Sequence, residues 1–302
     1  MTKKYNSQTP LVSIVIINYN TAKLTVQSIN TICSNTSYSS YELIIIDNAS
    51  HHKDQIILEE FCKSESLSLH IMEENLGWNR GVNHGFSIAN GDLLLTISSD
   101  VMVEHNWLNN MVEIYLSEKR VGAVNANIFE DGESIISAKD SYLKVLHGAC
   151  SMFSSDAWSI VGGLDYQNFT IYGGENDWSY RARSIGYKLL LSEKSIVNHL
   201  GSSKINAGGG LSVQKTGNKQ KILKVRLKDR FRFRAYNFKL KDWISKQILY
   251  EFKEAFKSGY LALLVFSYLK VFSNIKNIYQ ARRYRYLKMK YGVKILNSID
   301  DN

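Results

Sequence analysis

Residues 92–103 read DLLLTISSDVMV, and this stretch decides how the surrounding sequence is interpreted. The apolar run from Leu93 to Ile97 is typical of a buried strand. It ends abruptly in two serines and Asp100, and apolar residues resume at once. A lone carboxylate at the tip of a buried strand is costly unless a partner satisfies it. We therefore expect Asp100 to face a ligand, because open α/β sheets bind ligands beyond the carboxyl ends of their strands.

Strand-like and helical patterns alternate on both sides of this stretch. β-branched apolar runs predict strands at 11–19, 41–48, 67–74, 92–98, 121–129, 147–153 and 187–198. Helical spacing of apolar residues predicts helices at 22–33, 52–65, 79–90, 104–118 and 175–185. This alternation predicts an α/β fold with a central mixed, mostly parallel sheet that carries helices on both faces.

Composition limits the class of protein. The 302 residues are 44% hydrophobic, which is enough for a large core. No apolar run reaches the length of a membrane span, and the N-terminus lacks the pattern of a signal peptide, so we expect a cytoplasmic protein. Cys33, Cys62 and Cys150 are odd in number and widely spaced, which argues against disulfides and structural zinc and predicts buried free thiols.

Charge divides the chain into two regions. From Gln220 onward there are 20 Lys and Arg against 6 Asp and Glu, a net charge of +14, whereas the preceding residues have 17 against 22, a net charge of −5. Residues 201–219 are rich in Gly, Ser and Asn and are expected to form a mobile loop. We therefore divide the chain into a catalytic domain, 1–219, and a basic helical region, 220–302, which we expect to meet an anionic partner.

Polar side chains follow the expected strands at the points where those strands end. They are Asn18, Asn20, Asp47, Asn48, Asn75 and Asp100. Any one of them taken alone, Asn20 or Asn48 above all, also suits the cap of the next helix. Their convergence at one edge of the sheet favours a ligand pocket.

Glycines at 77, 81 and 85 recur every four residues, which smooths one face of the expected helix for close packing or for close approach of a ligand. They do not form the G-x-G-x-x-G fingerprint, and no G-K-[ST] sequence occurs. A dinucleotide-binding site and a P-loop are therefore weakly supported.

A second set of chemically active residues lies after Gly173 and Gly174. Glu175 and Asp177 fall in the first turn of an expected helix, where they either stabilise the helix dipole or provide a general base. His199 ends another apolar strand, and if it faces Asp100 the two side chains can share a divalent metal.

Taken together, these segments resemble an inverting glycosyltransferase of family 2, with the GT-A fold. The matching stretches are VSIVIINYN, LIIIDNAS, ENLGWNRGVNHGFSIANGD, LLTISSDVMV, VGGLDYQNFTIYGGENDWSYRARSIGY and VNHLGSS, which span about residues 11–203. Within the family the sequence is most similar to the bacterial rhamnosyltransferase-like branch. The resemblance implies a nucleotide-binding half at about 10–103 and an acceptor half at about 104–203.

The resemblance also implies roles for individual residues. The nucleotide sugar would be bound by Asn18, Asn20, Asp47, Asn75, Gly77, Asn79, Asn83, Ser98, Ser99 and Asp100. Asp47 would bond the base, and Asp100 with His199 would hold Mn²⁺, or Mg²⁺, on the donor diphosphate. The base would be Glu175, which we favour, or Asp177.

The sequence departs from the family pattern at two motifs. Ser98 replaces the first acid of the Asp-x-Asp motif, and a serine supplies no charge to a metal. The Gly174–Asp177 stretch lacks the usual Glu-Asp-x-Asp order, so that the identity of the base depends on the alignment. These departures affect metal affinity and donor type, not the fold.

The expected reaction is transfer of a sugar from dTDP-rhamnose or a UDP-hexose to a hydroxyl of a glycan, lipid-linked or part of a cell-surface polysaccharide. The basic, aromatic region 220–302 favours contact with an anionic membrane at the inner face of the plasma membrane. Packing of these helices on the catalytic domain, or on a second subunit in a homodimer, is the alternative. Nucleic acid is disfavoured because no recognition motif is present.

Two other classes of function compete with this prediction. A nucleotidyltransferase would need a glycine- and lysine-rich phosphate loop near the first strand, which NYNTAKLT does not provide. The other class is a non-catalytic binding protein that has the fold of nucleotide-sugar transferases. In such a protein the missing acids would reflect loss of catalytic residues.

Overall fold

The structure is a computed structural model of the 302-residue chain. It describes residues 9–136, 138, 140–169, 173–200, 219–237, 246–257 and 259–300. The loop expected at 201–219 lies outside these residues, apart from Lys219.

The N-terminal half alternates strands and helices as the sequence predicts. The elements are β1 (Val12–Asn18), α1 (Ala22–Asn35), β2 (Tyr41–Asp47), α2 (His52–Ser64), β3 (Ser68–Ile71), α3 (Gly77–Ile88) and β4 (Leu93–Ser98). The four strands pair in the order β3-β2-β1-β4, and every pairing among them is parallel. Their carboxyl ends consequently meet at one edge of the sheet.

The second half extends the same sheet with both strand directions. Its elements are β5 (Val101–Val103), α4 (Trp107–Ser117), β6 (Val121–Glu130), β7 (Glu133–Ser134), β8 (Cys150–Ser154), α5 (Ser155–Val161), α6 (Gly174–Ser184) and β9 (Lys188–His199). The strand order continues from β4 as β8-β6-β9-β5, and β7 pairs with β6. The β4–β8, β6–β8, β6–β7 and β5–β9 pairs are antiparallel and β6–β9 is parallel. The sheet is mixed as predicted, and parallel pairs predominate only in its N-terminal half.

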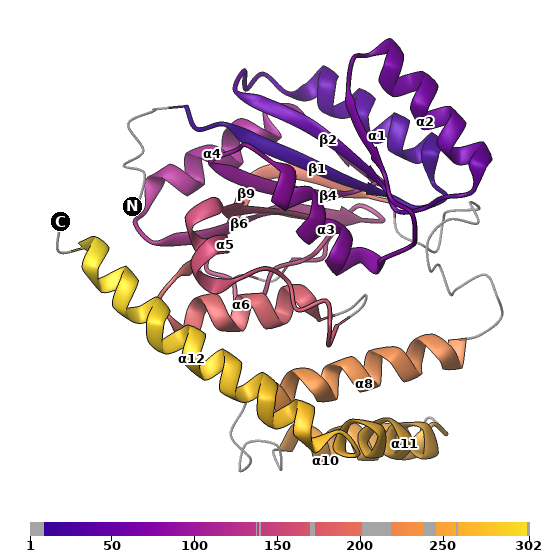
Figure 1. The fold of residues 1–302 in the computed structure, drawn as a ribbon, viewed down its shortest axis with the longest axis vertical. Coiled ribbons are helices and arrows are strands. Elements are labelled where there is room, and N and C mark those ends of the chain that lie inside the picture. Colours follow the sequence, from indigo (N-terminus) through magenta and orange to yellow (C-terminus); the bar gives the residue numbers. More distant parts are fainter. Residues whose placement is uncertain are drawn as a thin grey trace.

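Helices cover both faces of the sheet (Figure 1). One core lies under α1, α2 and α4, and a second lies under α3, α5 and α6. A Cβ atom at Gly85 would come within 2.3 Å of Val15 on β1, and one at Gly81 would lie 3.5 Å from Ile17. Of the two roles open for these glycines, close packing of α3 on β1 is therefore the one the structure shows.

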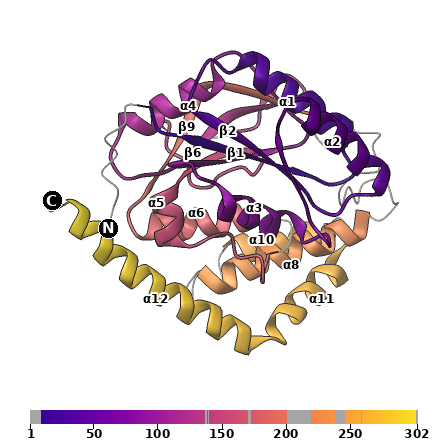
Figure 2. The same cartoon turned by 45° about the horizontal axis from the view of Figure 1, so that its top comes forward.

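The C-terminal region is helical, as expected, and packs on the catalytic half. It comprises α8 (Lys219–Asn237), α10 (Lys246–Lys257), α11 (Leu261–Phe272) and α12 (Ile275–Asp300). Figure 2 shows α12 running along α5 and α6 on the side away from the sheet. Phe169 joins this region to the catalytic half, because it is fully buried in a third apolar core with residues of α8, α10, α11 and α12.

No apolar run in the sequence reaches the length of a membrane span. Among the described residues no single helix is long and apolar enough to span a membrane, although Leu261–Phe272 and Lys276–Gly292, bent by 67°, meet the length and composition criteria as a pair.

Cys62 and Cys150 are buried free thiols, as predicted. Cys33 is also free, but it is exposed, and this corrects the expectation of burial because its position on α1 faces solvent.

Candidate active site

The carboxyl ends of β1 and β2 form a buried polar floor. The strand register places Asn18 opposite Asp47. The Asn18 amide donates to Asp47 Oδ1 at 2.7 Å, and the Ser50 hydroxyl donates to the same oxygen at 2.5 Å. Thr21 and Thr25 donate to Asn18 Oδ1 at 3.0 and 2.7 Å. Because Asn18 and Asp47 are fully buried, this network fixes the floor of the site before a ligand arrives.

The loops beyond these strands are tied together by amides. Asn20 has a φ of 54°, and its side-chain oxygen accepts a hydrogen bond from the backbone of His51 at 2.7 Å. Asn75 Oδ1 accepts from Asn48 Nδ2 at 3.1 Å and from the backbone of Gly77 at 2.9 Å. The structure thus brings Asn20, Asn75 and Gly77 to the predicted edge of the sheet, at the start of α3.

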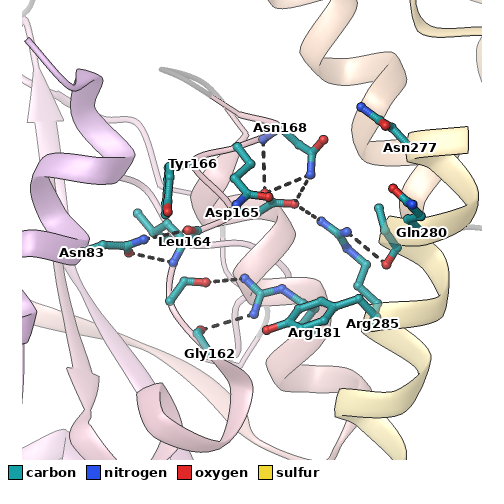
Figure 3. A pocket seen from close by; sticks show the side chains of 14 residues that line it. Asn83, Gly162, Leu164, Asp165, Tyr166, Asn168, Arg181, Asn277, Gln280 and Arg285 are labelled. Atoms are coloured by element: carbon teal, nitrogen blue, oxygen red, sulfur yellow. Dashed lines mark hydrogen bonds and ion pairs between the residues drawn. The ribbon is translucent and has the colours of Figure 1, made fainter. Parts of the chain in front are cut away.

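Two asparagines of α3 bond the loop that follows α5. Asn79 is fully buried, and its amide donates to the carbonyl of Phe169 at 2.6 Å. Asn83 both donates to the carbonyl of Leu164 and accepts from its N–H, at 2.8 and 2.9 Å (Figure 3). Their assignment to the nucleotide side stays a prediction; in the structure this face of α3 packs on the 162–169 loop, and both amides hold that loop.

Asp100 and His199 lie side by side, as the metal-site hypothesis requires. Antiparallel pairing of β5 and β9 sets Val101 opposite His199, and Asp100 Oδ1 lies 3.4 Å from His199 Nε2. Both side chains are partly accessible, at 14% and 18%. Ser99 contacts Thr21 through their hydroxyls at 3.0 Å, so that the Ser98–Asp100 stretch adjoins the floor.

Glu130, which the sequence analysis did not identify, fixes the orientation of His199. Its Oε1 lies 2.6 Å from His199 Nδ1, which leaves Nε2 directed at Asp100. Burial alone lowers the pKa of His199, but the contacts with Asp100 and Glu130 outweigh it and raise that pKa above its ordinary value. A carboxylate on the second ring nitrogen is the usual support of a metal-binding histidine.

Glu175 occupies the first turn of α6, beside the indole of Trp78. The helix begins after Gly173, whose φ of 87° is readily adopted only by glycine. Trp78 Nε1 donates to Glu175 Oε1 at 2.8 Å. Burial raises the pKa of Glu175, although the Trp78 bond and a backbone N–H oppose this. A buried carboxyl with a raised pKa at a helix start suits a general base.

Asp177 is held on all sides by cations and an amide. Arg181 Nε lies 2.9 Å from Oδ2, and Arg285 Nη2 and Asn237 Nδ2 each lie 2.8 Å from Oδ1. Burial would raise the pKa of Asp177, but the charges of Arg181 and Arg285 prevail and lower it. A carboxylate so completely bonded is a structural anchor, so the geometry favours Glu175 over Asp177 as the base.

The segment 147–149 connects the two halves of the site, and it matches no motif identified in the sequence analysis. The His147 ring lies 6.2 Å from that of His199. A Cβ atom on Gly148 would approach Glu175 Oε1 to 2.7 Å, so a larger residue there would displace the Glu175 carboxyl. The next carbonyl, of Ala149, accepts from the backbone of Ser98 at 2.9 Å. Three consecutive residues thus place Glu175 next to the strand end that carries Asp100.

The chain resembles known proteins in sequence and in structure. Residues 13–155 match the family model described as Glycosyl transferase family 2. Glycosyltransferase AglE of Haloferax volcanii is 26% identical over 209 residues, which cover 64% of this chain and 68% of AglE.

Two solved structures share the fold. Mannosyltransferase PcManGT from Pyrobaculum calidifontis, in complex with GDP-Man and Mn²⁺, superposes with a TM-score of 0.57 at 14% identity and covers 98% of this chain and 89% of its own. GalNAc-T7 with UDP, GalNAc and Mn²⁺ gives a TM-score of 0.57 at 17% identity over 77% of this chain, which spans only 51% of that protein. The strand-end polar floor, the glutamate that opens α6 and these matches agree: residues 13–155 are similar to glycosyltransferase family 2, and the chain adopts the GT-A fold.

Proposed function

We propose that this protein is an inverting glycosyltransferase that moves a sugar from a nucleotide-diphosphate donor to a hydroxyl of a glycan acceptor. The observation that supports this most is the juxtaposition of Glu175 with the Ser98–Asp100 strand end through Gly148 and Ala149. One base and one site for the leaving diphosphate are what a single in-line displacement requires.

In the proposed reaction Glu175 removes the proton of the acceptor hydroxyl as its oxygen attacks the anomeric carbon. The Trp78 indole bond holds the carboxylate in place, and a positioned base of this kind contributes roughly 10²–10⁴-fold in rate. Asn18 and Asp47 form the floor beneath the nucleotide. One displacement on the face opposite the leaving group inverts the configuration of the anomeric carbon.

A divalent metal, Mn²⁺ or Mg²⁺, fits the site through Asp100 and His199. His199 Nε2 and Asp100 Oδ1 face each other, and Glu130 occupies the other ring nitrogen. Within the described residues no group of three acid, imidazole or thiol side chains is placed to bind a metal, so the donor diphosphate must supply the remaining ligands. When bound, the ion would offset the charge of the leaving diphosphate.

The donor we propose is dTDP-rhamnose or a UDP-hexose, and the acceptor a lipid-linked or cell-surface glycan. The solved relatives support a nucleotide-sugar donor, because they are described with GDP-Man and with UDP and GalNAc. The rhamnosyl assignment depends on sequence resemblance in the Ser98–Asp100 stretch alone.

The metal site gives the first test of this function. We expect calorimetry to detect binding of one or more of UDP, dTDP and GDP, tighter with Mn²⁺ than with EDTA, and chromatography to detect hydrolysis of the matching nucleotide sugar. Asp100→Asn should remove the effect of Mn²⁺, and Glu130→Ala should weaken Mn²⁺-dependent binding about 10–100-fold by releasing His199. Glu133→Ala, an exposed neighbouring acid, serves as the matched control.

Each alternative function predicts a different result in this assay. A nucleotidyltransferase would consume a nucleoside triphosphate and a sugar phosphate and release pyrophosphate. A non-catalytic binding protein would bind the nucleotide sugar and leave it intact. No binding of any nucleotide diphosphate with Mn²⁺ would refute the proposed transferase function.

We further propose that α10 and α11 contact an anionic membrane surface, at the inner face of the plasma membrane. Leu249 and Phe256 are 67% and 74% exposed on α10 and lie two turns apart on the face that also carries Lys253. On α11, Leu269 is 62% exposed, next to Lys270. Apolar side chains interleaved with lysines suit insertion among anionic headgroups.

Vesicle binding tests this surface without disturbing the fold. Replacement of Leu249, Phe256 and Leu269 by Ser should reduce sedimentation with vesicles of phosphatidylglycerol and phosphatidylethanolamine by about tenfold or more, because about 2 kcal/mol of apolar insertion is lost per large side chain. Replacement of Ile56 and Leu116, exposed on the opposite part of the molecule, is the control. Equal binding by both variants, or none by the intact chain, would contradict the proposal.

A further inference from the structure

A cavity of about 580 Å³ lies between the loop Gly162–Asn168 and the first half of α12 (Figure 3). Its walls come from parts of the chain more than 100 residues apart: the loop after α5 on one side, and Asn277, Gln280 and Arg285 of α12 on the other. Its volume falls within the range of about 300–1,000 Å³ that is usual for small-molecule sites. Neither Asp100 nor Glu175 lines it, so it is separate from the proposed reaction centre.

The charged groups of the cavity already neutralise one another. Arg285 Nη2 contacts Asp165 at 2.7 Å and Asp177 at 2.8 Å. Arg181 pairs with Asp177 and donates to the carbonyls of the loop at Val161 and beyond. Two guanidinium groups therefore face two carboxylates, and both arginines are at least 95% buried. An anionic ligand such as a phosphate would find no uncompensated positive charge in this lining.

The groups that remain for a ligand are uncharged. Among the described residues, none bonds the side-chain amides of Asn277 and Gln280, and both amides line the cavity. Tyr166 is 39% exposed on the opposite wall, where Arg80 lies 5.5 Å from the centre of its ring and restricts its movement. An amide offers a hydrogen-bond donor and an acceptor together, which matches the hydroxyl groups of a sugar. An aromatic ring packs on the apolar face of the sugar ring.

The cavity shares its supporting helices with the reaction centre. On α3, Trp78 bonds Glu175, and Asn83, five residues later, borders the cavity. On α6, Glu175 lies in the first turn and Arg181 reaches the cavity six residues later. At a rise of about 1.5 Å per residue these separations are roughly 8–9 Å along either helix, comparable with the length of a disaccharide.

We propose that this cavity binds an uncharged saccharide portion of the acceptor, one or two sugar units away from the hydroxyl that reacts. The proposal rests on the transferase function proposed above, because it assigns a role to the non-reacting part of that acceptor. The cavity recognises the glycan chain through Asn277, Gln280 and Tyr166, and Glu175 acts on the terminal hydroxyl.

Saccharide binding by cavity variants tests this assignment. The probe is an array of defined oligosaccharides of two to six units, uncharged and uronic-acid-containing, applied to the intact chain with Mn²⁺ and UDP. We expect binding of one or more uncharged members, a loss of about tenfold or more in affinity in Gln280→Trp, which fills the cavity, and a similar loss in Asn277→Ala/Gln280→Ala. Tyr279→Ala, an adjacent side chain of α12 that is 66% exposed and outside the cavity, is the control and should bind normally.

The outcomes separate the two proposals. Unchanged affinity in both cavity variants would overturn the saccharide site, as would an intact chain that binds UDP but no member of the array. Preferential binding of the acidic oligosaccharides would also overturn it, because the lining offers no spare positive charge. Failure of nucleotide binding with retained, cavity-dependent saccharide binding would instead remove the transferase function and keep the site.

Discussion

Glu175→Gln is expected to lower kcat for transfer by about 10²–10⁴-fold while the affinity for the nucleotide sugar stays within about threefold. The amide keeps the shape of the side chain and can still meet the Trp78 indole, but it cannot accept the acceptor proton. Steady-state kinetics and calorimetry on the same preparation measure the two effects separately. Ser179→Ala, which alters a bond to the backbone carbonyl of Glu175 and not to its carboxyl, is the matched control.

The pH profile gives an independent readout of the same group. Transfer requires ionised Glu175, so kcat should fall as pH decreases through the pKa of that carboxyl. Because burial raises this pKa, the fall should occur at a higher pH than the ordinary value of about 4.3. Trp78→Phe removes a bond that favours the ionised form and should move the fall to still higher pH. Full activity in Glu175→Gln would assign the base to another residue.

Arg285→Gln is expected to lower the free energy of unfolding by roughly 3–5 kcal/mol. We expect this to be the largest effect on stability of any single substitution on α12. Arg285 is 4% exposed and contacts two carboxylates, Asp165 and Asp177. Its removal takes away one of the two guanidinium groups that contact the buried Asp177, and also the one that pairs with the partly buried Asp165. Urea unfolding followed by circular dichroism measures the change, and Arg283→Gln, an exposed arginine on the same helix, should cost little.

A double-mutant cycle distinguishes the ion cluster from a general loss of packing. Asp177→Asn alone should also destabilise strongly, because it removes the carboxylate that contacts Arg181 and leaves Arg285 with the partly buried Asp165. Asp177→Asn with Arg285→Gln should cost less than the sum of the two single changes. The pKa of Asp177 is lowered in the folded state, so its contribution is complete above the unfolded pKa and disappears as pH falls through the folded value. If the stability costs of the two single substitutions simply add in the double mutant, Asp177 and Arg285 do not stabilise each other, which would contradict the ion cluster.

The ion cluster also crosses the predicted boundary at residue 219, and the division of the chain there stays a prediction. Arg285 of α12 bonds Asp177 of α6 across 108 residues of sequence, and Asp177 lies two residues after Glu175. Deletion of 220–302 would therefore expose a buried aspartate beside the proposed base, and loss of activity in such a truncation would say nothing about membranes. Surface variants of α10 and α11 are the suitable probes for that question.

Local patterns in the sequence predict the strands and helices of the N-terminal half, and the edge of the sheet where we place the ligand site. β-branched runs and helical spacing are local, so the strands that end at Asn18, Asp47 and Ser98 could be read directly. Parallel strands joined by helices then require their polar ends to meet. The sequence analysis made a shared metal conditional on His199 facing Asp100; their 3.4 Å separation meets that condition, whereas their role as metal ligands stays a prediction.

Long-range packing distinguishes the polar residues that support the site from those that are available for chemistry. Glu175 and Asp177 are both candidate bases in the sequence, but α12 brings Arg285 to Asp177, and the 147–149 segment brings the Ser98 strand end to Glu175. Glu130 meets His199 because β6 and β9 pair in a register set by two irregularities. These contacts join residues dozens to more than a hundred positions apart, and no local pattern encodes such pairing. The residue types at the strand ends therefore indicate the chemistry of the site. Contacts formed by long-range packing determine which of those side chains are free to take part in it.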